Sequence, residues 1–223
     1  MVAGMWGNAL PVVLIAWLIG GIPFGYLFGR VRGIDIREHG SGNIGATNVT
    51  RVLGKRLGIT CFICDAAKGF LPVFVAAQLS LRDSGRWPEW LAAAAVVATV
   101  VGHVWTPYLK FRGGKGIATS AGALLAISPL PLVGALIVWL IVFYGSRYVS
   151  LASILAAAAL PFTGLLLRNF GPPPTNAIPS STLTLLTVIG VLAIARHHGN
   201  IKRLLNGTEN RFERKSKKET TLP

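Results

Sequence analysis

The sequence predicts an all-α integral membrane protein with seven transmembrane helices, and three observations support this fold class. Hydrophobic residues make up 52% of the 223 residues and charged residues only 13%, whereas a soluble domain carries about a quarter charged residues. The apolar residues fall into long runs separated by short polar segments, which is typical of a chain that crosses a bilayer several times. The cations are concentrated in alternate connections between these runs, as in multi-pass membrane proteins.

Seven segments are apolar enough to be spans. Crossing the hydrocarbon core takes roughly 20 apolar residues, or fewer where flanking side chains reach the interface. The candidate segments are 10–28, 59–79, 90–108, 117–127, 130–144, 151–167 and 183–195. We expect the first to be retained, because it lacks the basic n-region of a signal peptide. The fourth and fifth are short and meet at Ser128 and Pro129, so a single hairpin that dips into the bilayer is an alternative.

The distribution of Lys and Arg predicts the orientation. With seven spans, 18 of the 22 cations fall in one set of connections and three in the other, while Lys68 lies within a span. Because basic connections stay in the cytoplasm, we expect the N-terminus outside and the C-terminus inside. We expect one polytopic domain over residues 1–210 and a disordered basic tail over residues 211–223. The net charge of +14 is interleaved with apolar spans, which favours anionic lipids and phosphorylated small molecules over nucleic acid as partners.

The first polar motif, GSGNIGATNVTR at residues 40–51, predicts a phosphate-binding loop. Its glycines let backbone N–H groups approach an anion, and its Ser, Thr, Asn and Arg side chains are donors. An ordinary flexible loop is the alternative, and a Walker loop is excluded because no Gly-Lys-Ser or Gly-Lys-Thr occurs. The candidate residues are Gly40, Ser41, Gly42, Asn43, Gly45, Thr47, Asn48 and Arg51.

The second polar motif, GHVWTPYLKFRGGKGIAT at residues 102–119, predicts a second phosphate site. Its glycines surround a lysine just before an apolar segment, where a helix N-terminus would favour an anion. The alternatives are the positive-inside rule for the cations and an ordinary polar residue at a helix end for the histidine. The candidate residues are His103, Arg112, Gly113, Gly114, Lys115 and Gly116.

Smaller polar sets lie within or beside the spans. Asp65 and Lys68 are spaced i, i+3, and a structural ion pair is slightly favoured over a functional role. Ser150 and Ser153 occupy neighbouring turns, although serines in membrane helices often bond only to their own backbone. The C-x-x-C of residues 61–64 lies in an apolar run and favours packing over redox or metal chemistry.

The third polar motif, RHHGNIKRLLNGTE at residues 196–209, mixes cations, neutral donors and a carboxylate. If the preceding helix continues, His197 and Asn200 are i, i+3 neighbours, with Arg203 and Glu209 beyond them. Adjacent histidines cannot both face one metal from a helix, so we predict no metal site and no cofactor.

These three motifs resemble, in order, the three cytoplasmic motifs of the bacterial acyl-phosphate:glycerol-3-phosphate acyltransferases. DAAKG at residues 65–69 and RYVSLAS at residues 147–153 extend the resemblance, which covers residues 21–211. Arg112 stands where that family often has lysine, and His198 where it often has arginine. The H-x-x-x-x-D signature of thioester-dependent acyltransferases is absent, since Ile44 follows His39 at that spacing and Tyr108 follows His103.

The resemblance implies a seven-helix enzyme of the bacterial cell (inner) membrane with its active site on the cytoplasmic side. It implies transfer of a fatty acyl group from acyl phosphate to the 1-hydroxyl of glycerol 3-phosphate, the first step of phospholipid synthesis. The products would be lysophosphatidic acid and inorganic phosphate. We prefer direct, substrate-assisted transfer, with His103, His197 and Glu209 as the alternative general bases.

The resemblance also distributes roles among the motif residues. The loop of Lys115 is expected to hold the acyl phosphate, and the first and third motifs to hold glycerol 3-phosphate. An anion transporter and a lipid-headgroup scaffold are rival functions, and the oligomeric state stays open, with a monomer as one alternative. The residues expected to be catalytic are Ser41, Arg51, Lys115, His197, Asn200 and Glu209, and those expected to bind substrate are the other motif residues together with Ser150, Ser153 and Arg203.

Overall fold

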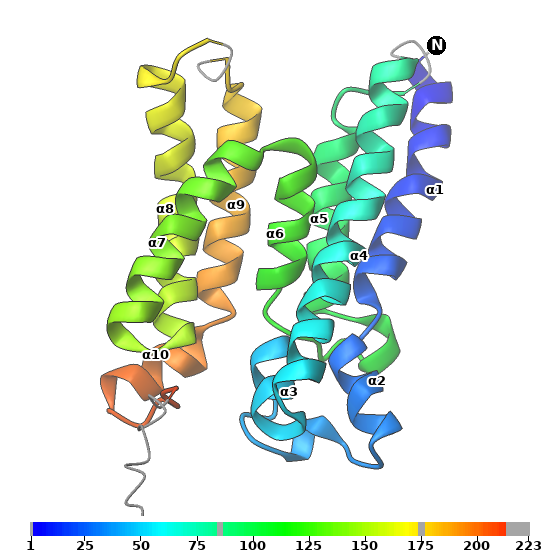
Figure 1. The fold of residues 1–223 in the computed structure, drawn as a ribbon. Helices are drawn as coiled ribbons and strands as arrows, with labels where there is room; N and C mark the ends of the chain where they lie inside the picture. Colours follow the sequence, from blue (N-terminus) through cyan, green and yellow to red (C-terminus); the bar gives the residue numbers. More distant parts are fainter. Residues whose placement is uncertain (1, 84–86, 174–176, 213–223) are drawn as a thin grey trace, which may run out of the picture.

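The computed structural model describes residues 2–83, 87–173 and 177–212, and every regular element within these ranges is a helix. Figure 1 shows two groups of helices side by side, one built from α1 to α6 and the other from α7 to α10. The elements are α1 (Val2–Gly21), α2 (Phe24–Val31), η1 (Ile36–Glu38), α3 (Ala46–Leu53), α4 (Lys55–Arg82), α5 (Leu91–Val104), η2 (Pro107–Leu109), α6 (Ile117–Ile127), α7 (Pro129–Ser146), α8 (Val149–Phe170), α9 (Ser180–Ala195) and α10 (His198–Leu205).

The expected multi-pass helical character is confirmed, and the number of spans is less simple than the sequence suggests. Five segments of the described chain are long and apolar enough to cross a membrane: Asn8–Val31, α4, Leu91–Leu109, α7 and α8. The pair α9 and α10 makes a sixth candidate, bent by 55° at its break. Helix α6 is apolar but has only 11 residues, about 16 Å of helix against a hydrocarbon core of about 30 Å.

The connection at Ser128 separates α6 from α7 and does not close a simple hairpin. Helix α6 packs against α4, whereas α7 packs against α8, so the two helices belong to different groups (Figure 1). Close approach of α4 and α6 depends on glycine: a Cβ at Gly122 would lie 1.8 Å from the carbonyl oxygen of Ala66. The two short segments are therefore separate helices with different packing partners, and the dipping hairpin stays an alternative prediction.

The first span is interrupted at Ile22 and Pro23, between α1 and α2. A break frees carbonyl groups at the end of the helix, and distant side chains bond to two of them. The Thr106 hydroxyl donates to Gly21 O at 2.6 Å, and the Lys68 ammonium donates to Ile22 O at 2.6 Å. Lys68 also pairs with Asp65 at 2.7 Å, so the expected i, i+3 pair is confirmed, and it is buried.

The ordered part of the C-terminus extends further than the sequence suggests. The Phe212 N–H donates to Arg147 O at 3.0 Å, and its ring meets Phe143 edge-on with centroids 6.0 Å apart. Arg211 Nε donates to Ser146 O at 3.0 Å. Residues 211 and 212, assigned to the tail from the sequence, thus belong to the fold, while residues 213–223 lie outside the described residues.

Candidate active site

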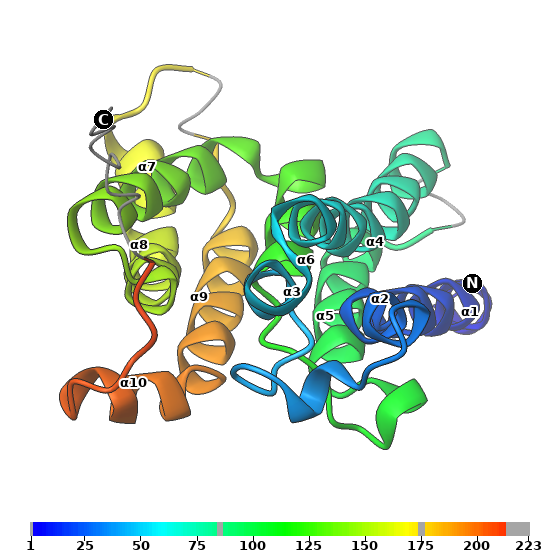
Figure 2. The ribbon, with the colours of Figure 1, turned by 60° about the horizontal axis from the view of Figure 1, so that its bottom comes forward.

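A cavity of about 500 Å³ lies between the two helix groups and brings the three polar motifs together. The short helices α3 and α10 and the connection before α6 gather at one end of the molecule, beside this cavity (Figures 1 and 2). The predicted site residues that line it are Ser41, Asn43, Gly45, Thr47, Asn48, Arg51, His103, Lys115, Gly116, Ser150, Ser153, His197, Asn200 and Glu209.

Six of the predicted residues lie outside this lining. Gly40 and Gly42 have positive φ angles of 61° and 70°, so they shape the first loop. Arg112 is exposed on the surface. Arg203 reaches Glu209 from outside the cavity, with Nε 2.7 Å from Oε2. The remaining two, Gly113 and Gly114, pack the second loop against α5.

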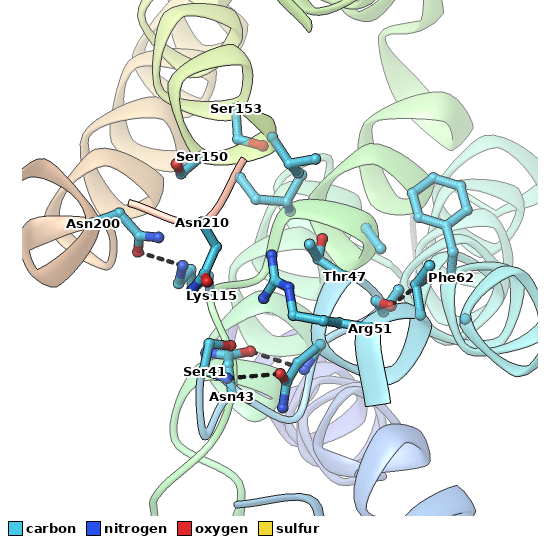
Figure 3. A pocket seen from close by; sticks show the side chains of 18 of the residues that line it. Ser41, Asn43, Thr47, Arg51, Phe62, Lys115, Ser150, Ser153, Asn200 and Asn210 are labelled. Carbon is cyan, nitrogen blue, oxygen red and sulfur yellow. Dashed lines mark hydrogen bonds between the residues drawn. The ribbon is translucent and has the colours of Figure 1, made fainter. Parts of the chain in front are cut away.

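Asn48 organises the first loop from within. Its Oδ1 accepts a hydrogen bond from the Ser41 N–H at 2.8 Å, and its Nδ2 donates to the carbonyl oxygens of Ile36 and His39 at 3.2 and 3.0 Å. The side chain is only 1% exposed. Because both ends of the amide are engaged, Asn48 holds Ser41 at the cavity edge, where Figure 3 shows Ser41 close to Asn43.

The second loop differs from the expected nest of free N–H donors. The N–H of Gly113 donates to Val104 O and the N–H of Gly114 to His103 O, both at 3.1 Å. These two donors therefore cap the end of α5 and are not free for a phosphate, contrary to the expectation for this motif. The anion-binding potential lies instead at the first turn of α6, where Ile117 and Ala118 line the cavity and where N–H groups lack partners within the helix.

Lys115 and Asn200 face one another across the cavity (Figure 3). Lys115 Nζ donates to Asn200 Oδ1 at 2.5 Å, and Asn200 Nδ2 donates to Glu209 Oε1 at 2.7 Å. The Ser150 hydroxyl donates to the same carboxylate oxygen at 2.8 Å. With Arg203, this network joins the second loop, α8 and α10 through one carboxylate. Burial alone would raise the pKa of Glu209, but its hydrogen bonds from Asn200, Ser150 and Arg203 outweigh this and lower it.

The cations that face the cavity are not fully compensated by nearby carboxylates. Burial, together with the nearby guanidinium groups of Arg203, Arg196 and Arg51, lowers the pKa of Lys115 to about 8, against the opposing effect of Glu209. Burial also lowers the pKa of Arg51, which projects into the cavity (Figure 3). A bound anion would stabilise both cations, so the site suits a phosphate group.

His197 lies at the break between α9 and α10, so the preceding helix does not continue through His197 to Asn200. The ring Nδ1 lies 2.7 Å from Ala193 O, which fixes the tautomer with a proton on Nδ1 and leaves Nε2 as an acceptor. Burial, followed by the charge of Lys115, lowers the pKa of His197 to about 4. A neutral imidazole therefore lines the cavity at neutral pH.

A second cavity of about 190 Å³ adjoins the first and is almost entirely apolar. Its lining comes from α4, α6, α7, α8 and α9, and four residues line both cavities: Phe62, Ile117, Trp139 and Ser153. Trp139 Nε1 donates to Ser153 Oγ at 3.2 Å at this junction. The apolar residues of this lining were not predicted from the sequence, because within a span they resemble residues that face lipid. It also missed Lys55, Asn210 and Phe212, which line the first cavity.

In the described ranges, no group of three or more His, Cys, Asp and Glu side chains could hold a metal ion. Cys61 is buried, Cys64 is half-buried, and both are free thiols.

A family model and curated relatives that match this chain share one description. A family model described as glycerol-3-phosphate acyltransferase matches residues 10–207. A glycerol-3-phosphate acyltransferase of Geotalea daltonii is 45% identical over 207 residues, which is 93% of this chain and 99% of that protein. One of Aquifex aeolicus is 42% identical over 205 residues, which is 92% of this chain and 100% of that protein.

Two solved structures are similar to this chain over its length. Both are crystal structures of PlsY, an integral membrane glycerol 3-phosphate acyltransferase, and both are 40% identical to this chain, covering 92% of it and 96% of PlsY. The glycerol 3-phosphate form has a TM-score of 0.81 and the lysophosphatidic acid form a TM-score of 0.79.

Proposed function

The chain belongs to the glycerol-3-phosphate acyltransferase family, and from this membership we propose that it transfers a fatty acyl group from acyl phosphate to the 1-hydroxyl of glycerol 3-phosphate. The products are lysophosphatidic acid and inorganic phosphate, in the first step of phospholipid synthesis. One observation carries the proposal: a cavity lined by cations and hydrogen-bond donors adjoins an apolar cavity and shares four lining residues with it. That combination suits an acyl phosphate, whose two halves need opposite surroundings.

The shared residues suggest where the reaction takes place. The acyl chain lies in the apolar cavity, the phosphates lie near Arg51 and Lys115, and the carbonyl carbon lies at the junction marked by Trp139 and Ser153. PlsY has been crystallised with glycerol 3-phosphate and with lysophosphatidic acid, which are the acceptor and the product in this scheme.

Acyl phosphate is a mixed anhydride, so the site needs no nucleophile of its own. The 1-hydroxyl oxygen of glycerol 3-phosphate attacks the carbonyl carbon, the bond from that carbon to the phosphate oxygen breaks, and the hydroxyl proton passes to the departing phosphate. Lys115 and Arg51 neutralise the charge that grows on this phosphate. Glu209 accepts bonds from three donors, so it positions Asn200 and Ser150 and does not act as the base. The neutral Nε2 of His197 is placed to accept a hydrogen bond from a substrate hydroxyl.

For the topology we propose seven spans, with α6 as the fourth and the N-terminus outside. The support is the concentration of cations in connections at the end that carries α3 and α10 (Figure 1), which would place the site on the cytoplasmic side of a bacterial inner membrane. In a chain without its native cysteines, single cysteines at Ser180 and Lys202 test this orientation. An impermeant maleimide applied to intact cells should label the first position only, and labelling of the second alone would reverse the topology.

The test of function is a minimal reaction. Purified protein in detergent receives palmitoyl phosphate and glycerol 3-phosphate, with thioesters and metals omitted, and lysophosphatidic acid and phosphate are measured. We expect both products in equal amounts. Product only with acyl-CoA or acyl carrier protein would refute the proposed donor, and phosphate flux in proteoliposomes without acyl product would favour the anion transporter.

A further inference from the structure

Asp65 and His103 form a polar pair in the wall of the first cavity that the proposed mechanism does not use. Asp65 comes from α4 and His103 from the last turn of α5, and both line the cavity. Their side chains are only 3% and 5% exposed. Polar side chains this deep in a membrane protein are costly unless they are bonded, which makes them candidates for a function.

The pair leaves one hydrogen-bonding position unfilled. His103 Nδ1 is buried without a hydrogen-bond partner, and it lies 3.8 Å from Asp65 Oδ1, which is too far for a direct bond. The carboxylate already meets Lys68 at 2.7 Å through Oδ1 and the Cys61 thiol at 3.7 Å through Oδ2. It can still accept another bond, because an ionised carboxylate has about four lone-pair positions. Both atoms are closed off from the cavity in this structure, so an oxygen bonds to both once the two side chains shift to admit it.

We propose that Asp65 and His103 form a hydroxyl-binding subsite that takes the 2-hydroxyl of glycerol 3-phosphate. The inference rests on the proposed function. The 2-hydroxyl donates its proton in a hydrogen bond to Asp65 Oδ1 and accepts one from the Nδ1–H of His103. The subsite then selects acceptors that carry a hydroxyl beside the reacting carbon, and it holds the glycerol backbone while the neighbouring 1-hydroxyl reacts.

Two features assign the subsite to the hydroxyl that does not react. Helix α5 contributes no residue to the lining of the apolar cavity and stands in the other helix group from α7 to α9 (Figure 1), so His103 lies apart from the walls that hold the acyl chain. Asp65 is also already held by Lys68 at 2.7 Å and by the Cys61 thiol at 3.7 Å, so its remaining lone-pair positions suit holding a hydroxyl in place.

The test compares glycerol 3-phosphate with 3-hydroxypropyl phosphate, which keeps the reacting hydroxyl and the phosphate at the same spacing and lacks only the 2-hydroxyl. We expect wild-type kcat/KM to favour glycerol 3-phosphate by roughly 10- to 100-fold, as for a buried hydrogen bond to a charged group. His103→Leu should reduce this preference to near unity and leaves the pair of Asp65 and Lys68 in place. His103→Asn, whose amide nitrogen replaces Nδ1, should retain most of the preference.

Thr99→Val is the matched control, because Thr99 is buried one turn earlier in α5 and bonds to Val96 O in its own helix. It should keep the wild-type preference, and thermal unfolding in detergent reports whether each variant folds. Two results overturn the inference: no preference in the wild type, or an equal loss with both acceptors in His103→Leu. Calorimetric binding of the two acceptors measures the same preference without acyl transfer, so failure of the proposed reaction is distinguishable from failure of the subsite.

Discussion

Replacement of Lys115 by methionine is the most direct test of the cation in the cavity. Methionine keeps a flexible apolar stem and removes the ammonium group that bonds to Asn200 Oδ1 at 2.5 Å. A preorganised donor to developing charge is worth roughly 2.7 to 4 kcal/mol of transition-state stabilisation, so we expect kcat to fall about 10²- to 10³-fold. The fold should survive, because Asn200 keeps its bond to Glu209 and its freed oxygen faces the cavity.

The assay is acyl transfer from palmitoyl phosphate to glycerol 3-phosphate, with thermal unfolding in detergent measured alongside. Lys110→Met is the control, because Lys110 is an exposed cation of the same connection and does not line the cavity. It should keep activity within about twofold of the wild type, in line with the small effect of surface charges. Turnover of Lys115→Met within about threefold of the wild type, in a folded protein, would refute the role of this lysine.

The pH dependence gives the same hypothesis a second readout. Because the pKa of Lys115 is lowered from 10.5 to about 8, the ammonium is present below that pH and lost above it. We expect kcat/KM to be level below pH 8 and to fall as the pH rises further, since kcat/KM reports the free enzyme. A bound phosphate raises the pKa of the lysine, so the decline in kcat should begin at higher pH. Lys115→Arg should remove the decline from this range, because guanidinium stays charged.

Three further predictions follow from contacts around the two cavities. Gly114→Ala should lower activity at least about tenfold, because its Cβ would lie 2.2 Å from His103 Nε2. Gly33→Ala is the control and should keep activity, because its backbone is strained at φ 75° but its Cβ meets no neighbouring atom. Glu209→Gln should lower kcat roughly 10- to 100-fold while the protein stays folded, because the amide cannot accept all three bonds of the carboxylate; unchanged kcat would contradict the positioning role. Ala157→Leu should narrow the apolar cavity and raise the ratio of lauroyl to palmitoyl transfer; an unaltered ratio would separate this cavity from the acyl chain.

The apolar helices could be predicted from the sequence because hydropathy is a local property, whereas the breaks between them depend on distant residues. Proline at position 23 is a local signal for the end of α1. The break is stable, however, because Thr106 and Lys68 bond to the freed carbonyl groups of Gly21 and Ile22, and these partners lie 85 and 46 positions away. Pairings of that separation leave no pattern in a single sequence.

The three polar motifs were found because glycine, amide and cationic residues are conspicuous between apolar segments. Which residues of each motif shape the loop and which bind substrate could not be predicted, because both roles use the same residue types. Both ends of the Asn48 amide form hydrogen bonds within the first loop, and the N–H of Gly113 caps α5. The apolar cavity was not predicted for the opposite reason, since residues such as Phe62 and Trp139 do not stand out from those of a lipid-facing surface.

The short length of α6 can be related to its position beside both cavities. Its N-terminal residue Ile117 lines both cavities, and Ser120, Ala121 and Leu124 continue along the apolar one. A helix of 11 residues covers about half of the hydrocarbon core, so in the proposed topology, with its C-terminus at the outer interface, its N-terminus and the adjacent Lys115 would be recessed below the headgroup level. An acyl phosphate whose chain lies along α6 would then meet its phosphate site without leaving the bilayer. A full-length helix would raise that site to the surface and separate it from the chain, so the short length of α6 agrees with its place beside both cavities.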